Sequence, residues 1–266
     1  MELTVGRDET ATACDLLARE TGLPKARIKD AMAKGAVLLR RGKTGKRLRR
    51  ATADLRAGDV LSLHYDAEIL ARQAPVATLV EDRRDYSVWR KPAGLLAQGT
   101  NFGDHCSMLR QAELHFNGRR PVFLVHRLDR EASGLMLIAH TPKAAARLSE
   151  LFQQNKVEKN YRAEVLGSPG PPDEEGVIDT PLDNKPARTF YTVQSINPAT
   201  GNAVLAIRIE TGRLHQIRRH LELIGHPVLG DPRYGTDNGD PRGLQLFAVA
   251  LRFICPLRRQ ALTFAI

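Results

Sequence analysis

The hydrophobic and polar positions divide the chain into two differently patterned parts. In the first part, helical patterns over residues 10–20 and 24–35 precede an apolar run at 36–39 and an apolar alternation at 60–63. A Thr-Gly pair ends the first helical pattern and Pro24 opens the second, as expected at helix boundaries. The pattern predicts a helix-helix-strand-loop-strand unit of about 65 residues, near the lower size limit for an independent core.

The second part begins near residue 81, where short apolar runs alternate with Gly and Pro. Two helical patterns stand out, at 141–155, where Thr141 is in position to cap the helix, and at 212–227. Apolar runs predict strands at 86–90, 135–139, 159–166, 203–210 and 246–253. We therefore expect an α+β body with a mixed, mostly antiparallel sheet flanked by helices.

These patterns predict three segments in the 266 residues. Residues 1–66 form a small N-terminal α/β domain, residues 67–80 are a linker, and residues 81–266 form the larger domain. No apolar run reaches the ~20 residues of a membrane span, and the N-terminus lacks a signal-peptide pattern. Three widely spaced cysteines indicate neither a disulfide framework nor a zinc site. We expect a monomer in the reducing cytoplasm, with no membrane contact.

The positive charge is concentrated in the first part. Residues 25–50 contain eleven basic residues and one acidic residue, an excess equal to the net charge of the whole chain, +10. Such a cluster favours a polyanionic partner such as RNA. The cations that we expect to contact RNA are Lys25, Arg27, Arg40, Arg41, Lys43, Lys46, Arg47, Arg49 and Arg50.

A carboxylate stands between two arginines in the segment VHRLDREASGL. Arg127 and Arg130 flank Asp129, and nearby cations favour the ionised form of a carboxylate. An ionised aspartate is suited to act as a nucleophile or a base. The alternative is a loop aspartate that caps a turn and pairs with a surface arginine.

Arg218 falls beside an apolar stripe on its predicted helix. The stripe begins at Leu214 and includes Leu221, whereas Arg219 points away from it. We expect Arg218 to be partly buried, and a buried guanidinium requires a carboxylate or phosphate partner, for which Asp129 is a candidate. The alternative is that Arg218 extends its charge to solvent along an apolar stem.

Tyr161 lies in a predicted strand, on the same face as Lys159 and Ala163. It could project from a sheet floor and offer its ring to a base. The alternative is a tyrosine of the core or of a sheet edge.

Four motifs occur in order: WRKPAGLL, HRLDREASGL, EKNYRAEVLG and TGRLHQIRRHLELIGHPVLGDPRYG. With them, residues 81–266 resemble the RluA-type family of RNA pseudouridine synthases. The resemblance implies the pseudouridine synthase fold and a reaction that detaches uracil, rotates it and rejoins it through carbon 5, with no metal or organic cofactor. In residues 1–66, the helix pair with KGAV and LRAGDVLSL resembles the alpha-L RNA-binding module of a small-subunit ribosomal protein.

The resemblance also implies roles for single residues. Asp129 matches the catalytic aspartate, which either attacks ribose carbon 1′ or removes the proton from carbon 2′. Tyr161 matches the tyrosine that stacks on the everted uracil and helps to remove the carbon 5 proton. Arg218 matches the salt-bridge partner of the aspartate. Arg127 matches the arginine that enters the RNA stack in place of the uridine.

Two further cations, Lys91 and Arg213, are expected to bind the RNA backbone in the same cleft, the alternative being solvated surface charges. The predicted function is isomerisation of specific uridines in structured RNA, with large-subunit ribosomal RNA favoured and transfer RNA left open. We expect no obligatory protein partner. The alternatives are a non-catalytic RNA-binding or ribosome-assembly protein, and a hydrolase that uses Asp129 to cleave an N-glycosidic bond.

Overall fold

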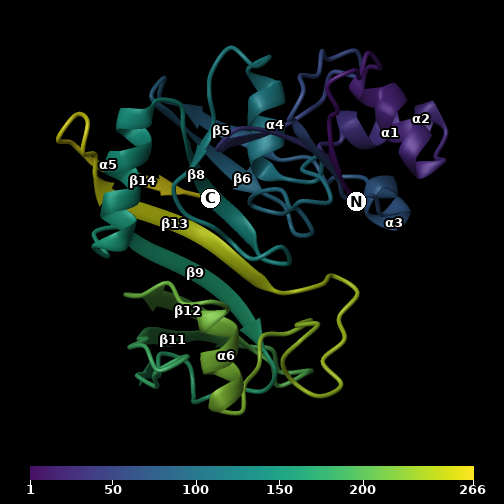
Figure 1. The fold of residues 1–266 in the computed structure, drawn as a ribbon. Helices are drawn as coiled ribbons and strands as arrows, with labels where there is room; N and C mark the ends of the chain where they lie inside the picture. The colour runs from purple at the N-terminus through teal and green to yellow at the C-terminus, as the bar shows by residue number, and fades with distance from the viewer. The chain divides into compact units, whose positions relative to one another are not determined.

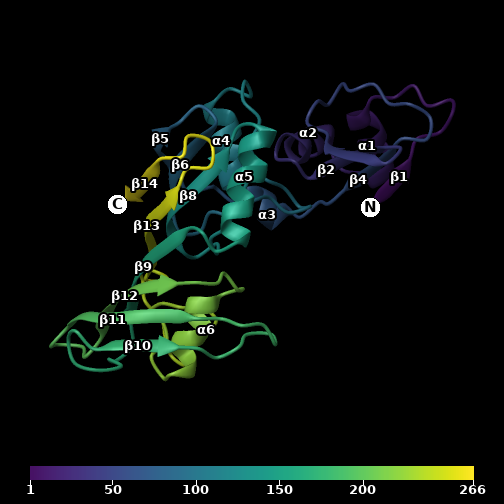
Figure 2. The ribbon, with the colours of Figure 1, turned by 90° about the vertical axis from the view of Figure 1, so that its left-hand side faces the viewer.

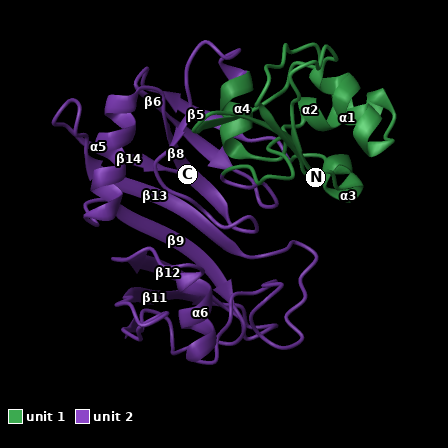
Figure 3. Ribbon diagram, viewed as in Figure 1, with its two compact units in different colours: residues 1–74, 98–114 green, residues 75–97, 115–266 purple.

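The computed structural model describes all 266 residues. The chain forms two compact units (Figure 3). Unit 1 contains Met1–Ala74 and Gln98–Leu114, and unit 2 contains Pro75–Ala97 and His115–Ile266. The stretch Gln98–Leu114 therefore packs with the N-terminal residues, although it lies within the segment 81–266. None of the helices is long and apolar enough to cross a membrane.

Unit 1 is built around a four-stranded antiparallel sheet in the order β1-β4-β2-β3. Thr12 caps the first helix through its side chain, and Gly22 ends it in the left-handed conformation, as the Thr-Gly pair predicted. The elements are β1 (Glu2–Thr4), α1 (Ala13–Thr21), α2 (Lys25–Ala33), β2 (Val37–Arg41), β3 (Thr44–Arg47), β4 (Val60–Leu63), α3 (Ala67–Ala71) and α4 (Met108–His115).

One prediction for this unit was wrong. The basic stretch after β2 is not a plain loop, because it contains β3, which forms a hairpin with β2 through the pair Arg41 and Thr44. Its Lys and Arg residues carry too little apolar character for the period of a strand to be visible in the sequence. The predicted linker 67–80 likewise contains α3 and the first residues of β5.

Unit 2 contains a ten-stranded sheet whose main path runs β10-β11-β12-β9-β13-β8-β6-β5. All of its strand pairs are antiparallel except β13 with β8, so the predicted mixed, mostly antiparallel α+β fold is confirmed. The elements are β5 (Thr78–Asp82), β6 (Tyr86–Lys91), β7 (Phe123–Leu124), β8 (Ser133–Ala139), α5 (Pro142–Gln153), β9 (Glu158–Val165), β10 (Glu175–Ile178), β11 (Thr189–Ile196), β12 (Ala203–Ile209), α6 (Gln216–Leu223), β13 (Leu246–Ile254) and β14 (Ala261–Ala265).

Strand β9 joins two hydrophobic cores within this sheet. One core lies under α5 on the β8 and β13 half, and the other lies under α6 on the β11 and β12 half (Figures 1 and 2). Along β9, the buried Lys159, Ala163 and Val165 share one face with the partly exposed Tyr161, and the alternate residues Asn160, Arg162 and Glu164 point to the other face, as the two-residue period of a strand requires. Tyr161 therefore lies between the two cores, on the face that carries the helices.

The start of α6 differs from the prediction. The helix begins at Gln216, because His215 adopts a left-handed backbone conformation with φ of +52° and turns the chain sharply. Leu214 consequently lies outside the helix and is 55% exposed. The predicted apolar stripe of Leu214, Ile217, Leu221 and Ile224 was thus wrong at both ends, since Ile224 is also exposed, while Ile217 and Leu221 are buried as expected.

Candidate active site

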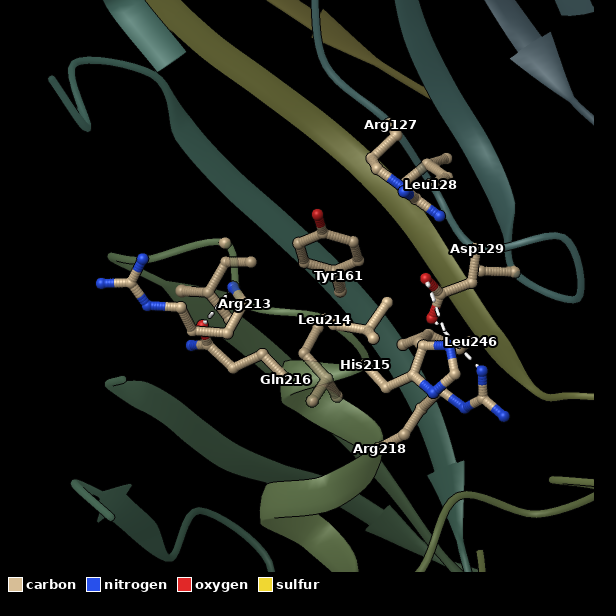
Figure 4. A pocket seen from close by; sticks show the side chains of 14 residues that line it. Arg127, Leu128, Asp129, Tyr161, Arg213, Leu214, His215, Gln216, Arg218 and Leu246 are labelled. Carbon is tan, nitrogen blue, oxygen red and sulfur yellow. Dashed lines mark hydrogen bonds and ion pairs between the residues drawn. The ribbon is translucent and has the colours of Figure 1, made fainter. Parts of the chain in front are cut away.

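A pocket of about 240 Å³ opens where the loop between β7 and β8 meets β9 and the start of α6 (Figure 4). It brings together five of the six side chains predicted for the reaction centre, the exception being Lys91. Its lining consists of Arg127, Leu128, Asp129, Ala132, Tyr161, Ile209, Gly212, Arg213, Leu214, His215, Gln216, Ile217, Arg218 and Leu246.

Local contacts fix the loop that carries Asp129. On the N-terminal side of Asp129, the His126 ring stacks on the Phe152 ring with their centroids 4.2 Å apart. The Nε2 atom of His126 accepts a hydrogen bond of 2.9 Å from the Leu137 N–H. Burial lowers the pKa of His126 to about 3, so the ring is a neutral anchor. On the C-terminal side of Asp129, Gly134 has a φ of +121°, and a Cβ atom at this position would collide with the backbone of Ala248 in β13.

Arg218 is buried, as the helical wheel predicted, and its Nη1 donates to Asp129 Oδ2 at 3.3 Å. Its closest partner, however, is Asp231, which accepts from Nε at 2.6 Å and from Nη2 at 2.7 Å. Burial by itself would lower the pKa of Arg218, but Asp231 and then Asp129 raise it above its usual range. The guanidinium therefore stays charged and spans two carboxylates.

The sequence analysis did not single out Asp231, although a physical signal was present. A guanidinium carries five N–H donors in a fixed fork, so a single carboxylate leaves a buried arginine partly unsatisfied and a second acceptor is required. Asp231 stands in the turn GDPRYG, where its Oδ1 also accepts from the N–H groups of Arg233 and Tyr234. The Tyr234 ring lies 5.1 Å from the guanidinium of Arg218 and adds a cation–π contact.

His215 is a second site residue that the sequence analysis missed. Its Nε2 lies 3.9 Å from Asp129 Oδ1, and its Nδ1 is 3.1 Å from the hydroxyl of Tyr234. Burial lowers the pKa of His215, and the nearby charge of Asp129 opposes this effect only in part. We therefore describe a neutral imidazole beside the carboxylate at pH 7.

Tyr161 rises from β9 into the middle of the pocket, between Asp129 on one side and Arg213 on the other (Figure 4). Burial, with a smaller contribution from the charge of Asp129, raises the pKa of Tyr161 above its usual range. The ring is thus a neutral phenol with one face open to the pocket. Arg127 is exposed above the same space, and Arg213 donates from Nε to the Pro186 carbonyl at 3.0 Å.

The expectation that Lys91 binds the RNA backbone was wrong. Its side chain is buried, and Nζ donates to the carbonyls of Pro92, Leu95 and Arg130 at 3.0, 2.8 and 3.1 Å. All three N–H donors of the ammonium are thereby used within the chain. Lys91 therefore ties the end of β6 to the residue after Asp129 and is part of the framework of the loop.

Three of the predicted RNA-binding cations in unit 1 form ion pairs with two carboxylates of the same unit. Arg47 and Arg49 both pair with Asp104, and Arg41 pairs with the buried Asp59 at 2.6 Å. These ion pairs leave less positive charge for phosphate than the sequence alone indicates, and contact of the three arginines with RNA stays a prediction. Partners at the surface contact four others, Lys25, Arg27, Arg40 and Arg50. Lys43 and Lys46 are exposed and have no partner.

Comparison with known proteins identifies the family. The sequence pattern described as RNA pseudouridylate synthase matches residues 85–223. A ribosomal large subunit pseudouridine synthase D of Nitrosomonas europaea is 36% identical over 188 residues, which are 64% of this chain and 53% of that protein. An uncharacterised RNA pseudouridine synthase of Aquifex aeolicus is 30% identical over 255 residues, 84% of this chain and 80% of the relative. The chain thus spans about half the length of the Nitrosomonas relative.

Solved structures agree with this match at the level of the fold. Human RNA pseudouridylate synthase domain containing 1 superposes with a TM-score of 0.60 at 23% identity, covering 72% of this chain and 83% of that one. Human RNA pseudouridylate synthase domain containing 4 superposes with a TM-score of 0.57 at 24% identity, and the match covers 71% of this chain and 87% of that one. The chain belongs to the RNA pseudouridylate synthase family, as its four motifs predicted.

Proposed function

We propose that this protein isomerises uridine to pseudouridine in RNA, in the pocket between Asp129 and Tyr161. The observation that carries the proposal is the contact of 3.3 Å between Arg218 and Asp129, which ties the carboxylate to one wall of a pocket of about 240 Å³. Tyr161 faces it from the other wall. The pocket therefore pairs an oriented carboxylate with a flat aromatic surface, as a reaction at the bond between a base and its ribose requires.

In the proposed reaction, the bond between N1 of uracil and carbon 1′ of the ribose breaks and a bond between carbon 5 and carbon 1′ forms. Carbon 5 loses its proton and N1 gains one, so the overall change is an isomerisation. Asp129 either attacks carbon 1′ as a nucleophile or removes the carbon 2′ proton as a base. Both routes use the carboxylate of Asp129, which the contact with Arg218 orients toward the pocket.

The remaining pocket residues receive roles in binding. Tyr161 stacks on the everted uracil, and its raised pKa favours this role over that of a proton acceptor at neutral pH. Arg127, exposed beside the pocket, enters the RNA stack where the uridine was and offsets part of the few kcal/mol that eversion costs. Arg213 contacts the backbone next to the everted nucleotide.

We infer that the substrate is structured RNA, with large-subunit ribosomal RNA favoured over transfer RNA. The relative in Nitrosomonas europaea is named for the ribosomal large subunit, which supports this choice. We assign residues 1–66 as an RNA-binding domain joined through 67–80 to a catalytic domain at 81–266. Within residues 1–66, the exposed and unpaired Lys43 and Lys46 contribute contacts to phosphate groups of the RNA. The three cysteines are free thiols, as in a protein of the reducing cytoplasm.

The test is release of tritium from RNA transcribed with uridine labelled at carbon 5. We expect release from large-subunit ribosomal RNA transcripts, retention of the uracil in the chain, and less release from transfer RNA transcripts. Release of free uracil would instead indicate a hydrolase. Binding of the transcripts without any tritium release would indicate a non-catalytic RNA-binding protein.

A further inference from the structure

Lys159 is a buried cation without a partner. It is 7% exposed, lies in the central strand β9, and no hydrogen bond or ion pair is made by its ammonium group. Burial alone lowers the pKa of Lys159 to about 8, since no carboxylate is near enough to oppose it. The side chain is largely buried and its ammonium, which lines a groove, has no counter-charge within the chain, so a ligand that supplies the negative charge would find a free cation there.

The surroundings of Lys159 are cationic. It lines a groove of about 520 Å³ between α5 and the segment that leads into α6. Arg127 and Arg213 also line this groove, and none of the side chains around it is a carboxylate. Ser149, Asn155 and Thr211 add neutral hydrogen-bonding groups to its wall. Three cations and several neutral donors without an acid are the composition of an anion site.

The groove continues directly from the candidate active site. Arg127, Tyr161 and Arg213 line both cavities, and Lys159 lies two residues from Tyr161 on the same face of β9. Successive residues on one strand face are ~7 Å apart, so Lys159 lies within reach of a phosphate beside a nucleotide whose base contacts Tyr161. A strand whose uracil stacks on Tyr161 would therefore carry an adjacent phosphate toward Lys159.

We propose that Lys159, with Arg213, binds the phosphodiester next to the target uridine. The proposal rests on the function assigned above and adds a specific backbone contact to it. The site takes a phosphodiester of the substrate strand because the groove is open and continuous with the base pocket, which favours a polymer that passes through both. A free phosphate ion carries the same chemistry and is distinguished in the test below.

The test measures binding of a five-nucleotide RNA with one central uridine to the full-length protein. We expect Lys159→Met to weaken binding about tenfold and to reduce the slope of log Kd against log salt by about 0.7, the value for one phosphate contact on a single strand. Lys159→Arg should retain most of the affinity. The matched control is Lys143→Met, which removes an exposed lysine of α5 that lines neither cavity and should change neither quantity.

Neutral methylphosphonate linkages locate the contact. One such linkage is placed at each of the four positions in turn, and a linkage beside the uridine should weaken binding to the wild-type protein more than binding to Lys159→Met, which keeps the arginine contact. Equal losses for both proteins at every position would overturn the proposal. Competition by inorganic phosphate at millimolar concentration, with no effect of any methylphosphonate, would instead identify a site for the free ion and also reject it.

A measurement on the unmodified protein does not depend on how the variants fold. Lys159 is partly neutral at pH 8.5, and a phosphate partner would restore its charge, so RNA binding should take up a fraction of a proton. Calorimetry in two buffers of different ionisation enthalpy measures this uptake, which should disappear in Lys159→Arg. Absence of uptake in the wild-type protein contradicts the site. None of these readouts requires turnover, so a failure of the isomerase assignment would appear separately, as missing tritium release.

Discussion

The two ends of the groove around Tyr161 differ in whether their cations are paired with acidic side chains. At one end, Arg218 contacts Asp231 at 2.6 Å, Asp129 at 3.3 Å and Glu131 at 3.7 Å, so the cation is matched by acids within the chain. At the other end, Lys159 faces two arginines and no acid. The difference indicates which charged groups are paired within the chain and stabilise its fold, and which are available to bind a ligand.

The largest effect is expected from Asp129→Asn. The substitution preserves the shape of the side chain but removes the only ionised group assigned to bond breaking, so tritium release should fall by about 10³-fold or more. RNA affinity should change by less than about threefold, because the phosphate contacts at the other end are untouched. Tritium release in single-turnover reactions and equilibrium binding check the two halves. Turnover near the wild-type rate would remove Asp129 from the reaction.

The next effect concerns stability at the paired end. Arg218→Ala leaves Asp231 buried without its bidentate partner and should destabilise the protein by about 3–5 kcal/mol, seen as a lower melting temperature. Arg219→Ala is the matched control on the neighbouring helix position. Arg219 pairs with Asp183, whose side chain is 65% exposed, so its loss should cost less than about 1 kcal/mol. Equal melting temperatures for the two variants would mean that the pair with Asp231 is not desolvated in solution.

The two buried lysines sharpen the contrast further. Lys91→Met leaves the carbonyls of Pro92, Leu95 and Arg130 without donors and should cost about 1–3 kcal/mol. Lys159→Met removes a buried charge that has no partner and should stabilise the RNA-free protein by about 2 kcal/mol. Denaturant titrations of both variants against the wild-type protein measure these opposite signs. Destabilisation by Lys159→Met would indicate a structural role instead.

The stabilisation by Lys159→Met should depend on pH. Burial lowers the folded-state pKa of Lys159 to about 8 from its ordinary value of 10.5, so below pH 8 the folded protein carries the full penalty of the largely buried ammonium. Between pH 8 and 10.5 the folded form loses its proton before the unfolded form does, and the stability of the wild-type protein rises relative to the variant. The advantage of the variant should therefore be largest at pH 7, fall between pH 8 and 10.5, and be about a quarter of its full value at pH 10.

Much of the framework around this contrast could be predicted from the sequence, because it follows from short-range patterns. Thr141 caps α5 as expected, and the strand period placed Lys159 and Tyr161 on one face of β9. The helical wheel correctly placed Arg218 in the interior. Each of these inferences needs only the residues within one element.

What could not be predicted depends on contacts between distant segments. Asp231 reaches Arg218 through a turn whose path is set by the tertiary fold, and Lys91 finds its carbonyl in the loop of Arg130, 39 residues away. The sequence does reveal which residues are cations. It does not reveal which of them the fold has already paired, because a carboxylate partner such as Asp104 is 55 residues from Arg49 along the chain.

The smallest effect concerns the same distinction in unit 1. Lys43 and Lys46 lie at and beside the β2–β3 hairpin turn, exposed and unpaired, whereas Arg47 and Arg49 are held by Asp104. The double substitution Lys43→Gln and Lys46→Gln should weaken binding of a structured RNA only several-fold and lower the salt slope by about one to two, because two phosphate contacts are lost. Asp104→Asn should destabilise this unit, since it removes the acid that two half-buried guanidinium groups share. An unchanged salt slope in the lysine variant would show that an exposed, unpaired cation does not by itself mark an RNA contact. An unpaired cation would then indicate such a contact only where its side chain is also largely buried, as at Lys159.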